Sequence, residues 1–173
     1  GLELCRRPSG GGIVDHRNDW TYALVIPAKH DLGVARAADS YAAVHQVLAD
    51  TLSTLGCPAG LQPPDQLKAS SPTPGASVCF TRAEPSDVIH TSSRLKLAGA
   101  AQKRGKRGLL FQGSIDRNNV GDIDWDAFEV QFIDGLASLL REPANPTPWP
   151  ADWDENVDAL AENYASPEWI ERR

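Results

Sequence analysis

The chain has 173 residues, of which 41% are hydrophobic and 23% charged, a length and composition that fit one compact domain and exclude a disordered or collagen-like chain. Its net charge of −6 argues against nucleic acid as a partner, because such binding depends on basic side chains that displace counterions from phosphates. The apolar runs are far shorter than the roughly 20 residues that span a bilayer, and no basic-then-apolar leader opens the chain, so we expect a cytoplasmic protein with no membrane partner.

The first predicted elements are a glycine-rich loop, a strand and a helix. The loop, residues 6–16 (RRPSGGGIVDH), joins two arginines to three consecutive glycines, which allow close approaches of the backbone. Residues 20–26 (WTYALVI) are rich in aromatic and branched side chains and stop at Pro27, which predicts a mostly buried strand. Apolar residues recur at three- and four-residue steps over 34–55, and Gly56 follows, which predicts a helix with a glycine at its C-terminal end.

The middle of the chain predicts an irregular connection followed by strands. Residues 58–76 hold five prolines and should lie at the surface, after which 77–80 resume a strand pattern. Two extended stretches, 94–102 and 108–115, flank the basic turn KRGKR, which predicts a β-hairpin with the basic cluster at its tip.

Two further helices are predicted near the C-terminus. Asp122 or Asp124 can cap a helix whose apolar stripe continues to Leu140 before Pro143 stops it. A last helix is expected over 152–164, followed by the short tail SPEWIERR. The order of strands and helices is typical of an α+β or a mixed α/β fold.

Few residues stand out as candidates for chemistry. Alternation along RLKLAGAAQ places Lys96 on the same strand face as Arg94 and Ala98, where it points either into a pocket or, like most strand lysines, into solvent. Cys79 in SVCF fits either a small core residue or a nucleophile activated by a nearby cation. The glycine-rich loop can hold a phosphate or carboxyl group or form a plain turn, and it lacks the lysine and hydroxyl of a Walker-type nucleotide loop. The cysteine and histidine spacings predict neither a disulfide framework nor a metal site.

These segments together resemble the biotin/lipoate A/B protein ligase superfamily, and within it the catalytic domain of lipoate-protein ligases and cysteine-dependent octanoyltransferases. RRPSGGGIVDH is similar to the family's RRxTGGGAVxH, DWTYALVIP to ELTYSxxxP, RLKLAGAAQKR to GRKxxGSAQxR, and LLFQGSI to LxHGSI, all in the same order. CFTRAEPS, which begins at Cys79, resembles the CFxxPS segment of the cysteine-dependent branch with one or two extra residues. The closing LAENYASPEWIERR is also similar to the family's last segment.

The resemblance implies an α+β fold with a mixed, mostly antiparallel sheet packed with helices, and a single catalytic domain over 1–173 that lacks the family's N-terminal portion. It implies that Lys96 contacts the acyl carbonyl and that Cys79 carries the acyl group. Leu95, Ala100 and Gln112 depart from the family pattern and affect details of the acyl pocket. The implied acyl or adenylate site, which includes no metal, comprises Arg6, Arg7, Ser9, Gly10, Gly11, Gly12, His16, Tyr22, Gly99, Ala100, Ala101, Gln112, Gly113 and Ser114.

Three functions follow as hypotheses. The first is transfer of an octanoyl or lipoyl group from octanoyl-acyl carrier protein to a lysine of a lipoyl domain, either of a 2-oxoacid dehydrogenase or of the glycine cleavage H protein, with no cofactor. The second is an ATP- and Mg²⁺-dependent ligase that activates free lipoate as lipoyl-adenylate. The third is a non-catalytic module that binds an acyl group or a carrier protein. The basic cluster Lys103, Arg104, Lys106 and Arg107 suits either docking of an acidic carrier protein or a solvated turn.

Overall fold

The computed structural model describes residues 5–9, 12–66 and 82–171. Its contacts divide the chain into two compact units, each of which is described by itself. The larger unit is Ser9–Ala144, and the smaller one combines Gly1–Pro8 with Asn145–Arg173. The predicted single domain over the whole chain stays a prediction.

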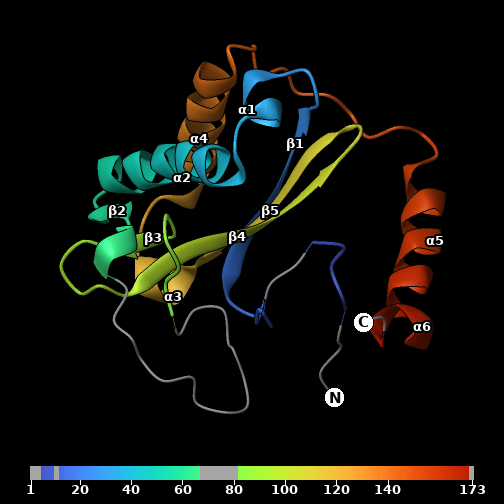
Figure 1. The fold of residues 1–173 in the computed structure, drawn as a ribbon, viewed down its shortest axis with the longest axis horizontal. Helices are drawn as coiled ribbons and strands as arrows, with labels where there is room; N and C mark the ends of the chain where they lie inside the picture. The colour runs from blue at the N-terminus through green and yellow to red at the C-terminus, as the bar shows by residue number, and fades with distance from the viewer. Residues whose placement is uncertain (1–4, 10–11, 67–81, 172–173) are drawn as a thin grey trace. The chain divides into compact units, whose positions relative to one another are not determined.

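The described part of the larger unit contains a five-stranded sheet (Figure 1). Its strands are β1 (Asp19–Pro27), β2 (Ala59–Leu61), β3 (Val88–His90), β4 (Lys96–Gly105) and β5 (Gly108–Asp116). Their order is β1-β5-β4-β3-β2, and every neighbouring pair among these strands is antiparallel. This arrangement confirms the predicted α+β class with a mostly antiparallel sheet.

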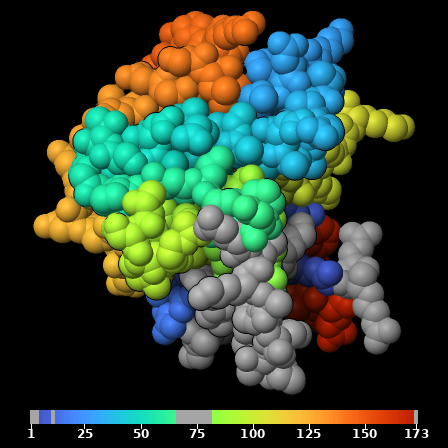
Figure 2. All heavy atoms as spheres, turned by 60° about the vertical axis from the view of Figure 1, so that its left-hand side comes forward, coloured from blue at the N-terminus to red at the C-terminus, as the bar shows by residue number. Residues whose placement is uncertain are grey.

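The predicted hairpin is confirmed and is longer than the sequence indicated. Strands β4 and β5 remain paired up to Gly105 and Gly108, so only Lys106 and Arg107 form the turn. The tip of this hairpin, in yellow, projects from the surface beside the short helix α1 (Asp31–Val34), in blue (Figure 2). The strand expected over 77–80 lies outside the described residues.

Two helices cover one face of the sheet. The helix predicted over 34–55 is confirmed as α2 (Ala37–Thr54), preceded by the separate short helix α1 (Asp31–Val34). Gly56 follows α2 with a φ of 94°, a conformation that favours glycine at a helix end. Helix α4 (Trp125–Leu140) begins at Asp124, whose carboxylate accepts hydrogen bonds from two backbone N–H groups of the first turn. A short helix, α3 (Arg117–Val120), follows β5.

The core lies between the sheet and these two helices, which Figure 1 shows side by side on the same side of the strands. Aromatic rings connect the two layers: Trp20 of β1 contacts Phe128 of α4 with a centroid distance of 5.1 Å, and Tyr22 contacts Phe132 at 5.3 Å. The buried members of the two core clusters include Ile26, Val44, Leu48, Leu52, Leu109, Phe111, Ile115, Phe128 and Phe132.

Strand β1 is half exposed, whereas its apolar sequence predicted a mostly buried strand. Trp20, Tyr22 and Ile26 point toward the helices, but Ala23 and Val25 are exposed, Val25 to 69%. The reason is that successive side chains of a strand point to opposite faces, and α2 and α4 cover only one of them. The described strands therefore have a covered face, against α2 and α4, and an open face.

The smaller unit contains α5 (Trp153–Ala165), which confirms the helix predicted over 152–164. The sequence did not predict α6 (Pro167–Ile170), although Ser166 as N-cap and a proline in the first turn are its usual signals. The backbone oxygen of Arg6 accepts a hydrogen bond of 2.5 Å from the Trp169 indole within this unit. In the part of the chain that the structure describes, no helix is long and apolar enough to cross a membrane.

Candidate active site

The open face of the sheet brings together four of the predicted acyl-site residues. Cross-strand pairing places Gly99 of β4 beside Ser114 of β5, and Ala101 beside Gln112. Directly opposite residues of an antiparallel pair point to the same face, so these four form two adjoining rows. The β1 partners that extend the rows are Thr21 and Ala23, which are also small. The result is a sheet surface whose side chains, apart from that of Gln112, are small or absent.

Three other predicted acyl-site residues belong to the covered face. Tyr22 packs over Gly113, where an added Cβ would lie 2.1 Å from the Tyr22 ring. Ala100 of β4 is the cross-strand partner of Gly113 of β5. Burial raises the pKa of the Tyr22 phenol well above its usual value, and among the described residues its hydroxyl has no hydrogen-bond partner. The structure thus places Tyr22, Ala100 and Gly113 in the core, and their acyl-binding role stays a prediction.

Lys96 does not follow the alternation that the sequence suggested. Leu97 and Ala98 are both fully buried in the core, and the pairing of β3 with β4 shifts register at this point. Arg94 lies before the strand, with a φ of 63°. The Lys96 ammonium instead lies against Gly99, because a Cβ on that glycine would be 2.9 Å from Nζ. The prediction that Lys96 shares a strand face with Arg94 and Ala98 is therefore wrong, because the register shift interrupts the two-residue repeat.

A buried carboxylate holds the Lys96 ammonium. The distance from Lys96 Nζ to Asp87 Oδ2 is 2.7 Å, and the two side chains are only 8% and 2% exposed. The hydroxyl of Tyr41, from α2, donates to Asp87 Oδ1 at 2.6 Å and accepts the backbone N–H of Ala100 at 2.9 Å. The backbone N–H of Glu84 donates to Asp87 at 2.7 Å. Burial, together with the charge of Asp87, raises the pKa of the Tyr41 phenol, so this group remains a hydrogen-bond donor.

His45 of α2 completes this buried cluster. Its ring lies 4.1 Å from that of Tyr41, and its Nδ1 donates to the backbone oxygen of Ser86 at 2.7 Å. Burial lowers the pKa of His45 to about 4, so the imidazole is neutral near pH 7. The sequence did not predict Asp87, Tyr41 or His45. Its only signals were an aspartate directly before an apolar strand and two polar groups on the inner face of a helix.

A second polar cluster lies on the open face around Asp19. Asp19 Oδ2 accepts a hydrogen bond from the Ser114 hydroxyl and lies 2.7 Å from His16 Nδ1. The Asp19 side chain is 3% exposed, whereas His16 is 59% exposed. Of these residues, His16 and Ser114 were predicted to belong to the site, and Asp19 was not. Cross-strand pairing of Ser114 with Gly99 joins this cluster to the Lys96 corner of the sheet.

The glycine-rich loop meets the same face through Ser9. The Ser9 hydroxyl donates to Gln112 Oε1 at 2.6 Å, and Ser9 is 7% exposed. Gly12 is described and exposed, whereas Gly10, Gly11 and Cys79 lie outside the described residues. Arg6 and Arg7 belong to the smaller unit, where an Arg6 guanidinium N–H donates to the backbone oxygen of Ile170 at 3.2 Å. Their place in an acyl site stays a prediction.

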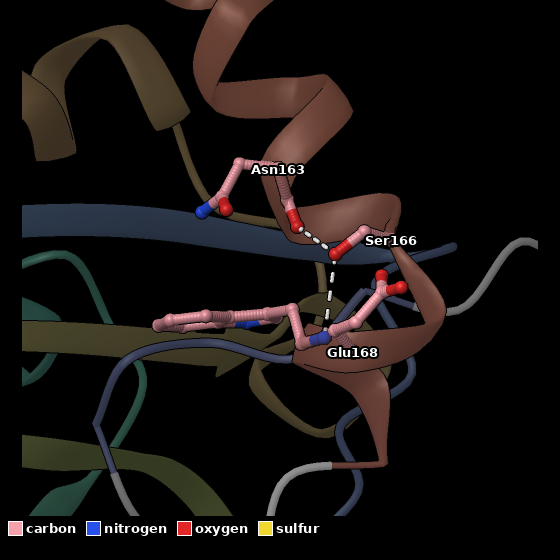
Figure 3. A pocket seen from close by; sticks show the side chains of 4 residues that line it. Asn163, Ser166 and Glu168 are labelled. Atoms are coloured by element: carbon pink, nitrogen blue, oxygen red, sulfur yellow. Dashed lines mark hydrogen bonds between the residues drawn. The ribbon is translucent and has the colours of Figure 1, made fainter.

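The described residues also form a surface pocket that includes none of the predicted site residues. This pocket lies at the junction of α5 and α6, lined by Asn163, Ser166, Glu168 and Trp169 (Figure 3). Its polar groups are explained by helix capping, since Ser166 Oγ donates to the backbone oxygen of Asn163 and accepts from the backbone N–H of Trp169. No group of three or more metal-binding side chains occurs among the described residues.

The basic hairpin tip is only partly a free charged surface. Arg104 donates to the backbone oxygen of Gly33 at 2.8 Å and to Ser40 Oγ at 2.7 Å, so it anchors the hairpin to α1 and α2. The other three cations of the predicted cluster, Lys103, Lys106 and Arg107, are exposed.

Comparisons with known proteins agree on one family. The model of the lipoyl protein ligase A/B catalytic domain matches residues 1–129. Octanoyltransferase LipM from Macrococcus caseolyticus (strain JCSC5402) is 25% identical over 214 residues, covering 100% of this chain and 75% of that protein. Octanoyltransferase LipM from Staphylococcus aureus (strain NCTC 8325 / PS 47) is 31% identical over 135 residues, covering 77% of this chain but 47% of the relative. The chain thus aligns with less than half the length of some of its relatives.

Solved structures share the fold. A crystal structure of lipoate-protein ligase A bound with ATP superposes with a TM-score of 0.70 at 18% identity, covering 96% of this chain and 70% of the other. A structure of protein Ta0514 from T. acidophilum with bound lipoic acid gives a TM-score of 0.68, also at 18% identity, with the same coverage of both chains.

Proposed function

The chain belongs to the lipoyl protein ligase A/B catalytic domain family, and on this basis we propose that it is an enzyme that transfers an octanoyl group to a lysine of a lipoyl domain. The octanoyltransferases among its relatives favour this activity over lipoate ligation. The proposed route passes through a thioester on Cys79, so it needs no cofactor. The donor is octanoyl-acyl carrier protein, and the acceptor is a lipoyl domain of a 2-oxoacid dehydrogenase or the glycine cleavage H protein, all in the cytoplasm.

The observation that carries this proposal is the buried Lys96 ammonium beside the small-residue surface. An ammonium fixed by Asp87 at 2.7 Å in a site of low exposure stabilises negative charge far better than one in water. Acyl transfer develops such a charge on the carbonyl oxygen in the tetrahedral intermediate. Gly99, whose missing side chain leaves room next to Nζ, lets a carbonyl approach this charge.

Cys79 supplies the nucleophile in this mechanism. Its thiolate attacks the thioester carbonyl of the donor, the carbon–sulfur bond to the carrier breaks, and the carrier leaves as a thiol once it gains a proton. The octanoyl group is then held by Cys79 until the acceptor lysine attacks the same carbonyl. Lys96 stabilises the oxyanion in both steps.

Intact mass spectrometry after incubation with octanoyl-acyl carrier protein tests the proposal. We expect one octanoyl adduct on the wild-type chain and none on Cys79→Ser. Cys5→Ser is the matched control, because Cys5 is exposed and should leave the adduct unchanged. Full transfer to a lipoyl domain by Cys79→Ser would exclude the thioester route.

An ATP-dependent lipoate ligase is the second candidate, because the fold is shared with a ligase structure that binds ATP. In that reaction ATP and Mg²⁺ would activate lipoate, and Cys79 would have no role. ATP–pyrophosphate exchange that depends on free lipoate would establish this activity and displace the transferase. A non-catalytic acyl-binding module would bind octanoyl-acyl carrier protein but give neither an adduct nor exchange.

A further inference from the structure

The second half of the proposed reaction needs a base. The acceptor lysine reaches the enzyme as an ammonium, and only its neutral amine can attack an acyl carbonyl. Lys96 is poorly suited to remove that proton, because its nitrogen forms an ion pair with the buried Asp87 carboxylate. An ammonium offers N–H donors and no lone pair. A side chain on the open face with a lone pair of its own would supply this base.

His16 has the geometry of such a base. Its Nδ1 lies 2.7 Å from Asp19 Oδ2, and a carboxylate can only accept, so in the neutral imidazole Nδ1 carries the hydrogen and Nε2 has the lone pair. The Ser114 hydroxyl holds Asp19 from the other side, and Asp19 is almost fully buried. The ring of His16 is itself 59% exposed, so a macromolecular substrate can reach Nε2.

The fold places this pair next to the Lys96 corner. Ser114, which binds Asp19, is the direct cross-strand partner of Gly99, and Gly99 adjoins the Lys96 ammonium. Direct partners have side chains roughly 5 Å apart on the same face. Ser114 of β5 thus connects Asp19 of β1, which holds the imidazole, to Gly99 of β4, which adjoins the Lys96 ammonium.

The other three histidines are occupied in different ways. His30 accepts the Leu32 N–H at the start of α1 and contacts the Leu140 backbone oxygen. His45 is buried and bonded to Ser86. His90 accepts two backbone N–H groups of the turn that follows β3. Of the four, only His16 combines an exposed ring with a buried carboxylate partner.

Apart from Asp19, the charged groups next to His16 have partners of their own. Asp15 and Arg17, on the same loop, bond to each other, with a distance of 2.8 Å from Arg17 Nε to Asp15 Oδ1. From β1 the facing group is Asp19 itself. From β5, Asp116 lies opposite Asp19, and its carboxylate caps α3.

We propose that His16, held by Asp19 and Ser114, is the catalytic base that deprotonates the acceptor lysine, an inference that rests on the proposed transferase function. Nε2 takes one proton from the acceptor ammonium. The neutral amine then forms the amide bond as the bond from the carbonyl carbon to the Cys79 sulfur breaks, and the electron pair goes to sulfur. The second proton of the attacking nitrogen goes to that sulfur, and His16 returns its proton to water. Asp19 and Ser114 are positioning residues in this step.

The test isolates the second half-reaction. Octanoylated enzyme is purified, mixed with excess lipoyl domain and followed by intact mass as a function of pH. In His16→Asn the amide keeps an N–H donor for Asp19 but lacks a base, so we expect transfer at neutral pH to slow about 100-fold or more. The deficit should shrink at high pH, where more of the acceptor is already neutral. The rate of adduct formation from octanoyl-acyl carrier protein is measured on the same variant, so that the loss in the second half-reaction is read independently of the first.

Two further variants make the result specific. His30→Asn preserves a cap acceptor at the start of α1 and should leave both half-reactions unchanged. His16→Ala should recover transfer in proportion to added imidazole, a response that a purely structural role would not produce. The inference would be overturned if octanoylated His16→Asn transferred the octanoyl group at the wild-type rate, or if imidazole failed to rescue His16→Ala. Absence of any adduct on the wild-type chain would instead refute the proposed function, and the inference with it.

Discussion

The two faces of the sheet differ in character although strands β1, β4 and β5 contribute residues to both. On the covered face, aromatic and branched side chains such as Phe111 and Ile115 are fully buried against α2 and α4. On the open face, the same strands carry Gly99, Ala101 and Ser114, whose side chains are absent or small. Strand alternation thus divides each short motif between the two faces: one residue packs in the core, and the next lies on the face where we propose the chemistry.

Replacing Asp87 should break this separation, because Asp87 bonds both to Tyr41 of α2 and to Lys96. Asp87→Ala leaves a buried ammonium without its carboxylate, and we expect the free energy of unfolding to fall by about 3–5 kcal/mol. Acyl transfer per folded molecule should fall as well. Urea denaturation and the adduct assay measure the two effects. Asp50→Ala, on the exposed side of α2, should change stability by less than about 0.5 kcal/mol.

Acid should lower the free energy of unfolding through the buried His45 of α2. Its pKa is about 4 in the folded chain and 6.5 ordinarily, so between these values the unfolded chain binds a proton that the folded chain does not. The contribution of His45 is therefore complete above pH 6.5 and is lost as the pH falls toward 4, by about 3 kcal/mol in all. His45→Gln should lack this part of the pH dependence in denaturant titrations. Parallel curves for the variant and the wild type would contradict the assignment.

One substitution made on both faces tests the contrast directly. Gly113→Ala forces a methyl group into the Tyr22 ring and should cost about 1–3 kcal/mol of stability, with little effect on transfer per folded molecule. Gly99→Ala meets the end of the Lys96 side chain, which can move aside, so stability should change less. Displacement of the ammonium should slow acyl transfer about 10- to 100-fold. Equal effects of the two variants on both measurements would remove the distinction between the faces.

The hairpin tip lies outside both faces and should affect only the rate at which the enzyme and its carrier protein associate. Reversing the charges of Lys103, Lys106 and Arg107 should slow transfer from an acidic carrier protein about three- to tenfold at low salt, and less as salt is added. Arg104 is left intact because it bonds to Gly33 and Ser40. Stopped-flow or steady-state rates at two ionic strengths measure the effect, with Lys29→Glu as the control for charge alone. If the charge-reversal variant and the wild type had equal rates at both ionic strengths, the tip would be a solvated turn with no role in docking.

The main elements could be predicted from the sequence because their signals are local. Periodicity predicted α2, α4 and α5, and the basic turn between extended stretches predicted the β4–β5 hairpin. Strands β2 and β3 were missed because each has three residues, too few to show alternation. Helix α6 was missed although Ser166 and Pro167 mark its start.

The site was predicted less completely because its parts meet across long separations. Motif resemblance predicted Lys96 as a site residue, but not its partner Asp87, which bonds in turn to Tyr41, 46 residues away in the sequence. Alternation predicted the wrong neighbours for Lys96, because a register shift between strands leaves no trace in the residue pattern. Asp19 was likewise invisible, since its role depends on Ser114, 95 residues further on.

The hydroxyl of Tyr41 has a mechanical consequence. It occupies the edge of β4 at Ala100, beyond the last residue that β3 pairs with, and the same oxygen holds the carboxylate of Asp87. Helix α2 is therefore connected to Lys96 through two bonds, from Tyr41 to Asp87 and from Asp87 to the ammonium. A shift of α2 along its axis would move Asp87 and with it the ammonium. Mutations that weaken the packing of α2, far from the open face, would in this way displace the Lys96 ammonium before they unfold the chain.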